Sequence, residues 1–522
     1  MVVNGVSAVH FAVFWPKGLK MLLDTQLDLD IDLHSGGFIT PFWLAIKTSQ
    51  RICKDEPPTL CSNCSCSESV KILLDYKCYL HRDLMGSYLY PNKFRPSTRA
   101  AHTLLMHIRY WRKKLEEIAR RELSESEYLE LGLCNSSVLD YAAPEVISKL
   151  EARAISPYRE WRLHPNDYRL SPSANAPWGT SSIYHEISTA DTAQIAFDLG
   201  FRDIDAVYKG RTPVMQKQNT LEYCGWLIFH GASPTNLVPW VDYDGPSKLT
   251  VDNGLPRHIV AHTLMWKIGK EFDRICHHTV RHSINGALLS SCLSRFNPPG
   301  CDLIRKLCVL QVGDGCECAC SEQEEGCSPL LLFLNWSYMV AKFGQEREEL
   351  TIWIHEHLLA DASSESALHI AFTAIRALTF HALNIRHTCC TMIPRKWGYY
   401  HMFKWTFAHF DLKQIKSITD DFPHIRKEDE SLLDEFEELM DELKEEFCSG
   451  AYTLSDFLKG YWRKRLEQVQ KAREARRFTE TELEGLTELG VRLRKKRQHT
   501  IKDPLVDIHR VEYWVREIDK IV

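Results

Sequence analysis

The residues with the clearest chemistry are two groups of closely spaced cysteines among the 18 in this 522-residue chain. The two groups are Cys316-x-Cys318-x-Cys320-x6-Cys327 and Cys61-x2-Cys64-x-Cys66. Thiolates are the ligands that tetrahedral Zn²⁺ prefers in structural sites, and closely spaced cysteines in a loop can wrap around one ion. We therefore predict a structural zinc site in the later loop, with the ligands Cys316, Cys318, Cys320 and Cys327.

The first three cysteines of the later group fall within five residues, which is tight for four ligands around one ion. A ligand from elsewhere would improve the geometry, and His387, Cys389 and Cys390 are the candidates. Two alternatives stay open, namely a polar loop with reduced cysteines and disulfides formed under oxidising conditions. The same alternatives hold for the three cysteines of the earlier group.

The elements that would position these loops recur with a regular period. Thr40-Pro41-Phe42-Trp43 begins thirty-three positions after Ser7-Ala8-Val9-His10, and Thr212-Pro213-Val214-Met215 begins thirty-one positions after Ser181. Such a tetrapeptide opens the first of two short antiparallel helices, because Ser or Thr caps a helix and Pro fits its first turn. A period of about 33 residues with this opening is the ankyrin pattern.

Two internal spacings support the repeat. Leu22 follows Ser7 by fifteen positions, and Leu227 follows Thr212 by the same interval. Gly231 supplies the turn with which such repeats leave their second helix. Unrelated helical hairpins with Gly and Pro turns are the alternative. The pattern predicts an all-α, ankyrin-like helical solenoid, in which each hairpin buries its apolar face against the next.

These segments resemble the degenerate ankyrin-repeat proteins of filamentous fungi. The likeness extends to residues 199–205, 221–224, 230–232 and 387–390. Only Ser7-Ala8-Val9-His10 keeps the motif histidine in register. The resemblance implies an interaction scaffold and supplies no known activity.

The second repeat is interrupted by an insertion. Val70-Lys71-Ile72-Leu73-Leu74 matches the segment around Leu22 at a spacing of fifty-one positions, so about eighteen extra residues lie within 50–67. Insertions in repeat proteins collect in surface loops, where binding or regulation is often located.

Further helices are expected between and after the repeats. Apolar residues spaced by three and four from Leu104 to Ile118 predict a long amphipathic helix, and Ser124-Glu125-Ser126-Glu127 opens a short one. The acidic stretch 428–447 and the basic stretch 462–477 predict an antiparallel helical hairpin. Six regions are predicted in all. The first three are N-terminal repeats with a cysteine-rich insertion (1–90), a helical connector (97–164) and a linker (165–178). The last three are a second repeat group (179–270), a helical region with the later cysteine loop (271–410) and charged C-terminal helices (411–522).

Composition narrows the class of protein. With 44% hydrophobic and 25% charged residues the chain resembles ordinary soluble proteins, and no apolar run reaches the roughly 18 residues of a membrane helix. The net charge of -5 argues against nucleic acid as a partner. The sequence contains no phosphate-binding loop, nucleophile elbow or His-Glu-x-x-His helix, so we predict a protein that is not an enzyme and takes no small-molecule substrate.

These observations lead to two functional hypotheses. The first is a non-enzymatic scaffold in the cytoplasm that binds protein partners, with the basic run at 492–497 as a candidate nuclear-import signal. The alternative is a zinc-dependent or redox-responsive regulatory protein that acts through its cysteine-rich loops.

Overall fold

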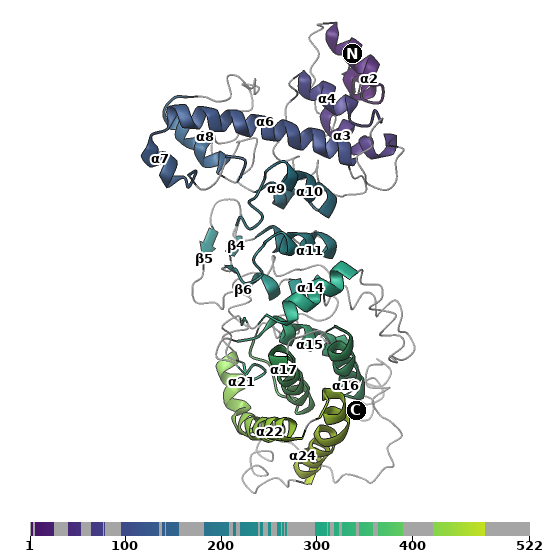
Figure 1. Cartoon of the computed structure of the whole chain (residues 1–522), viewed down its shortest axis with the longest axis vertical. Coiled ribbons are helices and arrows are strands. Elements are labelled where there is room, and N and C mark those ends of the chain that lie inside the picture. The colour runs from purple at the N-terminus through teal and green to yellow at the C-terminus, as the bar shows by residue number, and fades with distance from the viewer. Residues whose placement is uncertain are drawn as a thin grey trace, which may run out of the picture. The chain divides into compact units, whose positions relative to one another are not determined.

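The computed structural model is built from helices joined by loops and a few very short strands (Figure 1). This agrees with the all-α class predicted from the sequence. The described residues fall in the following stretches, several of which contain short gaps: 2–25, 40–53, 64–78, 96–155, 182–268, 298–389 and 421–475. Two compact units divide the chain, Met1–Trp462 and Arg463–Val522. No helix within the described stretches has both the length and the apolar character to cross a membrane.

Two helical hairpins form the N-terminal part. Its elements are β1 (Val2–Val3), β2 (Val6–Ser7), α1 (Ala8–Ala12), α2 (Pro16–Asp24), α3 (Pro41–Ile52) and α4 (Glu68–Asp75). β1 pairs antiparallel with β2, α1 packs against α2 and α3, and α4 packs against α2 and α3. The Oγ1 atom of Thr40 accepts the Trp43 N–H at 3.0 Å, which caps α3 as predicted. Because α3 ends at Ile52 and α4 begins at Glu68, the predicted insertion lies between them.

A long helix comes next in the chain. The elements here are α6 (Thr98–Glu122), α7 (Glu125–Glu130) and α8 (Ala143–Ala152). The predicted amphipathic helix is confirmed, since Leu104, Ile108 and Leu115 are buried along one face of α6. Ser124 and Glu127 form a capping box at the start of α7. α6 packs against α3, α4, α8 and α10, so it connects the first hairpins to the segments that follow.

The second group of predicted repeats contains short helices. They are α9 (Ile183–Glu186), α10 (Ala190–Asp198), the 3-10 helix η3 (Pro213–Met215) and α11 (Leu221–Phe229). The Oγ atom of Ser182 accepts the Tyr184 N–H at 3.2 Å, so the cap lies one residue after Ser181. His185 therefore stands three residues after its cap, as His10 does after Ser7. Sequence reasoning assigned this position to His10 alone and missed His185.

α10 and α11 end in the same way. Gly200 and Gly231 have φ angles of +100° and +106°, a region that glycine enters without steric cost. After each glycine, the next backbone N–H bonds the carbonyl five residues earlier, at 3.1 and 2.9 Å. This is the Schellman arrangement, which satisfies carbonyls that the helix end leaves open.

A buried or half-buried carboxylate holds the chain just after each of these glycines. Asp140 Oδ1 accepts the N–H of Arg202 at 3.0 Å. Asp205 accepts the N–H of Ser233 through both carboxylate oxygens, at 2.8 and 3.0 Å. Asp140 lies just before α8 and Asp205 lies after α10. The first bond therefore ties the start of α8 to the turn after α10, and the second ties the segment after α10 to the turn after α11.

The junction between α6 and α10 also contains buried charge. Arg112 is 2% exposed, and its Nη1 atom donates to the carbonyl of Asp140 at 2.8 Å while the guanidinium lies over the Phe201 ring. Burial raises the pKa of Asp203 to about 7, although Arg112 acts in the opposite direction. This junction therefore has a charge state that depends on pH.

Four short strands lie between α11 and α14. They are β3 (Leu237–Val238), β4 (Val241–Tyr243), β5 (Leu249–Val251) and β6 (His258–Ile259). β3 pairs antiparallel with β6, and β4 with β5.

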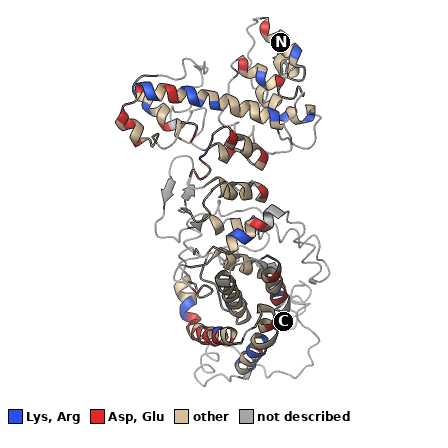
Figure 2. Cartoon of the chain, in the orientation of Figure 1, with Lys and Arg blue, Asp and Glu red and all other residues tan. Residues whose placement is uncertain are grey.

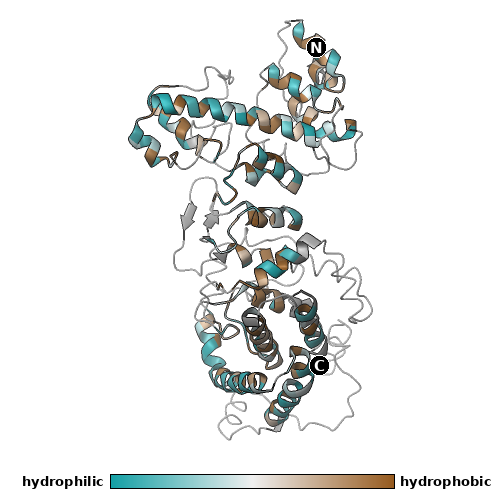
Figure 3. Cartoon of the chain, viewed as in Figure 1, coloured by the Kyte–Doolittle hydropathy of each residue, from teal (hydrophilic) through white to brown (hydrophobic). Residues whose placement is uncertain are grey.

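The helices that carry the later cysteine loop follow. They are α14 (Pro298–Cys308), α15 (Pro329–Val340), α16 (Gly344–Trp353), the π-helix η4 (Ile354–Leu358) and α17 (Ser364–Ala382). α11 packs against α14, α14 against α15, and α15 against both α16 and α17. Figure 3 shows the brown of hydrophobic residues in α17, which fits a helix with Ala371, Ile375 and Phe380 buried.

The first unit ends with α21 (Phe422–Glu428), α22 (Glu430–Ser449), α23 (Leu454–Phe457) and the π-helix η6 (Leu458–Trp462). The predicted acidic helix is α22, which is mostly red in Figure 2 and buries Phe436, Leu439 and Leu443. α22 packs against α17 and α21. The predicted basic helix is α24 (Arg463–Ala475), which begins the second unit. The linker predicted at 165–178 and the basic run at 492–497 lie outside the described residues.

Candidate metal centre

Two loops far apart in sequence meet beside α15 and α17. The first, residues 318–322 and 326–328, precedes α15, where the Ser328 hydroxyl accepts the Leu331 N–H at 3.2 Å and caps the helix. The second, residues 385–389, leaves α17 after Asn384, whose φ of 56° turns the chain back. Because α15 packs against α17, the two loops come together.

Four side chains at this meeting point form what we name the late cluster, Cys318, Cys320, His387 and Cys389. Their ligand atoms all lie within 4.8 Å of one another, and all four residues are buried. The Sγ atoms of Cys320 and Cys389 are 3.8 Å apart. The Nδ1 atom of His387 is 3.7 Å from the Cys389 sulfur and 4.0 Å from the Cys318 sulfur. One soft divalent cation could be bound by all four at once.

The predicted ligand set overlaps with this cluster in part. Cys318 and Cys320 belong to it, and two of the candidates for an additional ligand, His387 and Cys389, complete it. Cys327 lies next to it, with its sulfur 3.5 Å from that of Cys320. Cys316 and Cys390 are outside the described residues.

The surroundings of the late cluster act differently on its titratable groups. The Thr388 N–H donates to the Cys318 sulfur at 3.3 Å. Burial lowers the pKa of His387, but the neighbouring sulfur atoms of Cys320 and Cys389 outweigh it and raise that pKa to about 9. Burial opposes ionisation of Cys320 as well, yet hydrogen bonds from Cys318 and Cys327 lower the pKa of its thiol. Burial raises the pKa of the Cys318 thiol well above its usual range, so Cys320 is the member of this group whose thiolate the surroundings favour.

Arginines from α17 and α21 hold the two loops in place. Arg376 of α17 donates from Nε to the carbonyl of Ala319 at 3.0 Å, and its Nη1 atom pairs with Glu437 of α22 at 3.0 Å. Arg426 of α21 donates to the Thr388 hydroxyl at 3.3 Å. Ala319 and Thr388 are therefore held in place, and this orients the cluster side chains next to them in the chain.

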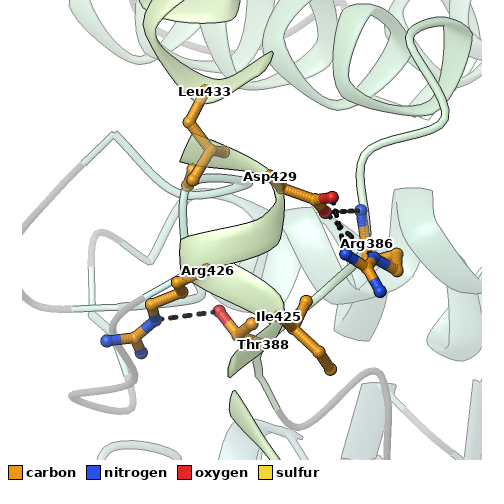
Figure 4. Close-up of a pocket in the computed structure, with 7 residues that line it drawn as sticks. Arg386, Thr388, Ile425, Arg426, Asp429 and Leu433 are labelled. Carbon is orange, nitrogen blue, oxygen red and sulfur yellow. Dashed lines mark hydrogen bonds and ion pairs between the residues drawn. The ribbon is translucent and has the colours of Figure 1, made fainter. Parts of the chain in front are cut away.

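A pocket lies where α21 meets residues next to the cluster, and Figure 4 shows the side chains that line it. It is lined by Ala319, Arg386, Thr388, Ile425, Arg426, Asp429 and Leu433. Arg386 donates to Asp429 through Nη2 at 2.7 Å, and Arg426 is bonded to Thr388. Both arginines are engaged within the protein, so the pocket offers structural contacts between α21 and the cysteine loops.

A second group of cysteines, here named the early cluster, consists of Cys53, Cys64 and Cys66. Their sulfur atoms also lie within 4.8 Å of one another. Cys64 and Cys66 belong to the group found from sequence, whereas Cys61 lies outside the described residues. Sequence reasoning missed Cys53, which stands at the end of α3 and eleven positions before Cys64. The available signal was the position of Cys53, because it lies at the other end of the insertion from Cys64 and Cys66.

Comparisons with known proteins add no relative to these observations. A scan against protein-family models finds no match to the chain, and no curated protein matches its sequence.

Proposed function

We propose that the protein is a non-enzymatic scaffold of ankyrin-like helical repeats, stabilised by zinc, that binds protein partners. The observation that carries the proposal is the recurrence of one helix-ending turn after thirty-one positions. Gly200 and Gly231, which end α10 and α11, are thirty-one positions apart and are followed by the same carboxylate-to-backbone bond. Repeats of this kind contact only their neighbours and display extended surfaces for partners.

Two buried histidines, His10 and His262, also support the proposal. Ser7 Oγ lies 2.9 Å from His10 Nδ1, so the first histidine stiffens the start of its own hairpin. His262 Nε2 lies 2.8 Å from the carbonyl of Cys327, the residue just before the cap of α15. A histidine that bonds the backbone ahead of the next helical segment ties neighbouring repeats together, as the ankyrin motif does.

Zinc is the metal that the late cluster fits best. Bonds of about 2.3 Å to sulfur and about 2.0 Å to nitrogen in a tetrahedron separate ligand atoms by about 3.5–3.8 Å. The distances of 3.7, 3.8 and 4.0 Å in the cluster come close to this. Four protein ligands fill the coordination shell, which is typical of a structural rather than a catalytic ion.

Metal analysis tests this assignment. Protein purified without chelator is expected to contain zinc, and the Cys389→Ser variant is expected to lose about one equivalent. The exposed Cys134 provides the matched control, since Cys134→Ser should keep the wild-type content. Equal zinc in wild type and Cys389→Ser would contradict the assignment.

Partner binding needs a separate test. The first hairpin exposes large apolar side chains, with Phe11 69% and Met21 65% accessible, so these can be changed without loss of core packing. We expect proteins that co-purify with the full chain from native extract to be lost with Phe11→Ala and Met21→Ala. Leu129→Ala, an exposed apolar change on α7, is the control. If the full chain retains no protein above the level of an inert bait, the scaffold proposal fails.

A second candidate function is a redox-responsive regulator, favoured by one distance. The 3.5 Å between the Cys320 and Cys327 sulfur atoms is short enough for a disulfide after a small movement. A two-electron oxidant such as peroxide would remove two protons and two electrons, join these sulfurs and release the metal. Intact mass after mild peroxide treatment tests this, because Cys327→Ser should abolish a loss of two hydrogens seen in the wild type. No such loss in the wild type would exclude the switch.

A further inference from the structure

We infer that the early cluster, Cys53, Cys64 and Cys66, is a second metal site, which binds one thiophilic metal ion through three thiolates. The sulfur atoms lie within 4.8 Å of one another, close enough for all three to reach a single ion. The ligands come from both ends of the insertion, since Cys53 follows α3 and Cys66 precedes α4. One ion there would close the insertion and fix the spacing of the two helices.

Hydrogen bonds around the early cluster resemble those that support metal-bound thiolates. The Ser97 hydroxyl donates to the Cys66 sulfur at 3.2 Å. The Arg99 guanidinium donates to the carbonyl of Cys64 at 3.0 Å, which places a cation against the main chain of one proposed ligand. Donors and cations of this kind stabilise the thiolate over the thiol, which is the form that binds metal.

The start of α6 supplies a further positive field. Ser97 is the N-cap of this 25-residue helix, and the same hydroxyl accepts the Ala100 N–H at 3.2 Å. Because Ser97 also contacts Cys66, the positive end of the helix dipole lies beside the cluster. Three thiolates and one divalent ion carry a net charge of about -1, which this end of the helix and Arg99 would stabilise.

The early cluster differs from the late one in access to solvent. Cys53 and Cys64 are half-buried, whereas all four ligands of the late cluster are buried. A site with three protein ligands and solvent access leaves a coordination position for water or another small ligand. Soft thiolate ligands select zinc or cuprous copper, so these are the two ions that the site would take.

Elemental analysis of the full-length protein tests the inference. Zinc and copper are counted in wild type, Cys64→Ser, Cys66→Ser and the exposed control Cys134→Ser, all purified without chelator. We expect Cys64→Ser and Cys66→Ser to hold about one equivalent less of either metal than wild type, and Cys134→Ser to hold the same amount. This difference concerns the early cluster alone, whatever the late cluster contains. Unchanged metal content in both variants, with wild-type circular dichroism, overturns the proposal.

A measurement on the wild type guards against misfolded variants. A chelator is added with a metal indicator, and release is followed over time. We expect two phases, with about one equivalent leaving at least tenfold faster because the early cluster is open to solvent. The Cys389→Ser variant should keep the fast phase and lose the slow one. A single slow phase in the wild type overturns the proposal, even if the cysteine variants prove insoluble.

Discussion

The junctions from α8 to α11 and the late cluster join neighbouring segments by opposite means. In the first region, the fully buried Leu227 and bonds such as that from the Ser233 N–H to the Asp205 carboxylate hold the helices together. In the late cluster, two loops 69 residues apart meet through sulfur and imidazole. The first is held by apolar packing and hydrogen bonds, whereas the second brings three thiols and an imidazole within reach of one cation. Under the proposed function, packing holds the helices of the first region together, and a metal ion would join the two loops of the second.

Removal of metal should produce the largest difference between the two regions in amide hydrogen exchange. Treatment with chelator, or Cys389→Ser, should speed amide hydrogen exchange in residues 318–328 and 385–389 by more than ~100-fold, because structural zinc contributes folding free energy directly. Exchange in residues 190–233 should stay within about threefold of the untreated protein. Mass spectrometry of peptides from both regions measures this. Equal acceleration everywhere would show that the junctions of the repeats also depend on the metal.

Truncation of the repeat core should produce the reverse pattern. Leu227→Ala removes a side chain with 0% exposure, so we expect a loss of ~2–5 kcal/mol in the free energy of unfolding. Urea unfolding, together with metal analysis of the same sample, measures the effect. Metal content should remain that of the wild type. Leu129→Ala is the control, because its 58% exposed side chain should change stability by less than about 0.5 kcal/mol.

On the α6 to α10 side of the comparison, stability should depend on pH through Asp203. Burial raises the pKa of Asp203 to about 7, above that of the same group in the unfolded chain. The folded state then binds the proton more tightly, so this contribution to stability is full below about pH 4 and is lost as the pH rises through 7. Thermal unfolding of wild type and Asp203→Asn between pH 5 and 8 measures it. A slope that persists unchanged in Asp203→Asn would assign the effect to other groups.

The smallest effect should come from the turn that ends α11. A Cβ atom at Gly231 would meet only Ile204 at 3.8 Å, so Gly231→Ala tests the backbone angle of +106° by itself. We expect a loss of ~1–2 kcal/mol in the free energy of unfolding, from the cost of a left-handed conformation for alanine. Gly460→Ala, inside the π-helix η6, where nothing lies within 4 Å and the backbone is not left-handed, is the control and should gain ~0.5–1 kcal/mol. If Gly231→Ala is as stable as this control, the turn adapts to alanine.

Local features were predictable where short-range rules decide them. The cap at Thr40, the capping box of Ser124 and Glu127, and the amphipathic helix around Ile108 follow from neighbours within one or two helical turns. The class of the fold was accessible for the same reason, because helical periodicity is written along the chain.

The members of the two clusters could be predicted from the sequence only in part. Cys318 and Cys320 stand together in the sequence, but their partner Cys389 comes from another loop, and the packing of α15 against α17 decides that they meet. Cys53 was missed because its distance from Cys64 along the chain carries no periodic signal.

The sequence by itself determined the helices, their caps and the supply of thiol groups, since these depend on residues close together in the chain. Only the tertiary structure decided which thiols and which histidine share a site. The physical reason is that a metal-sized cluster requires atoms within about 4 Å, and such proximity is set by how whole helices pack.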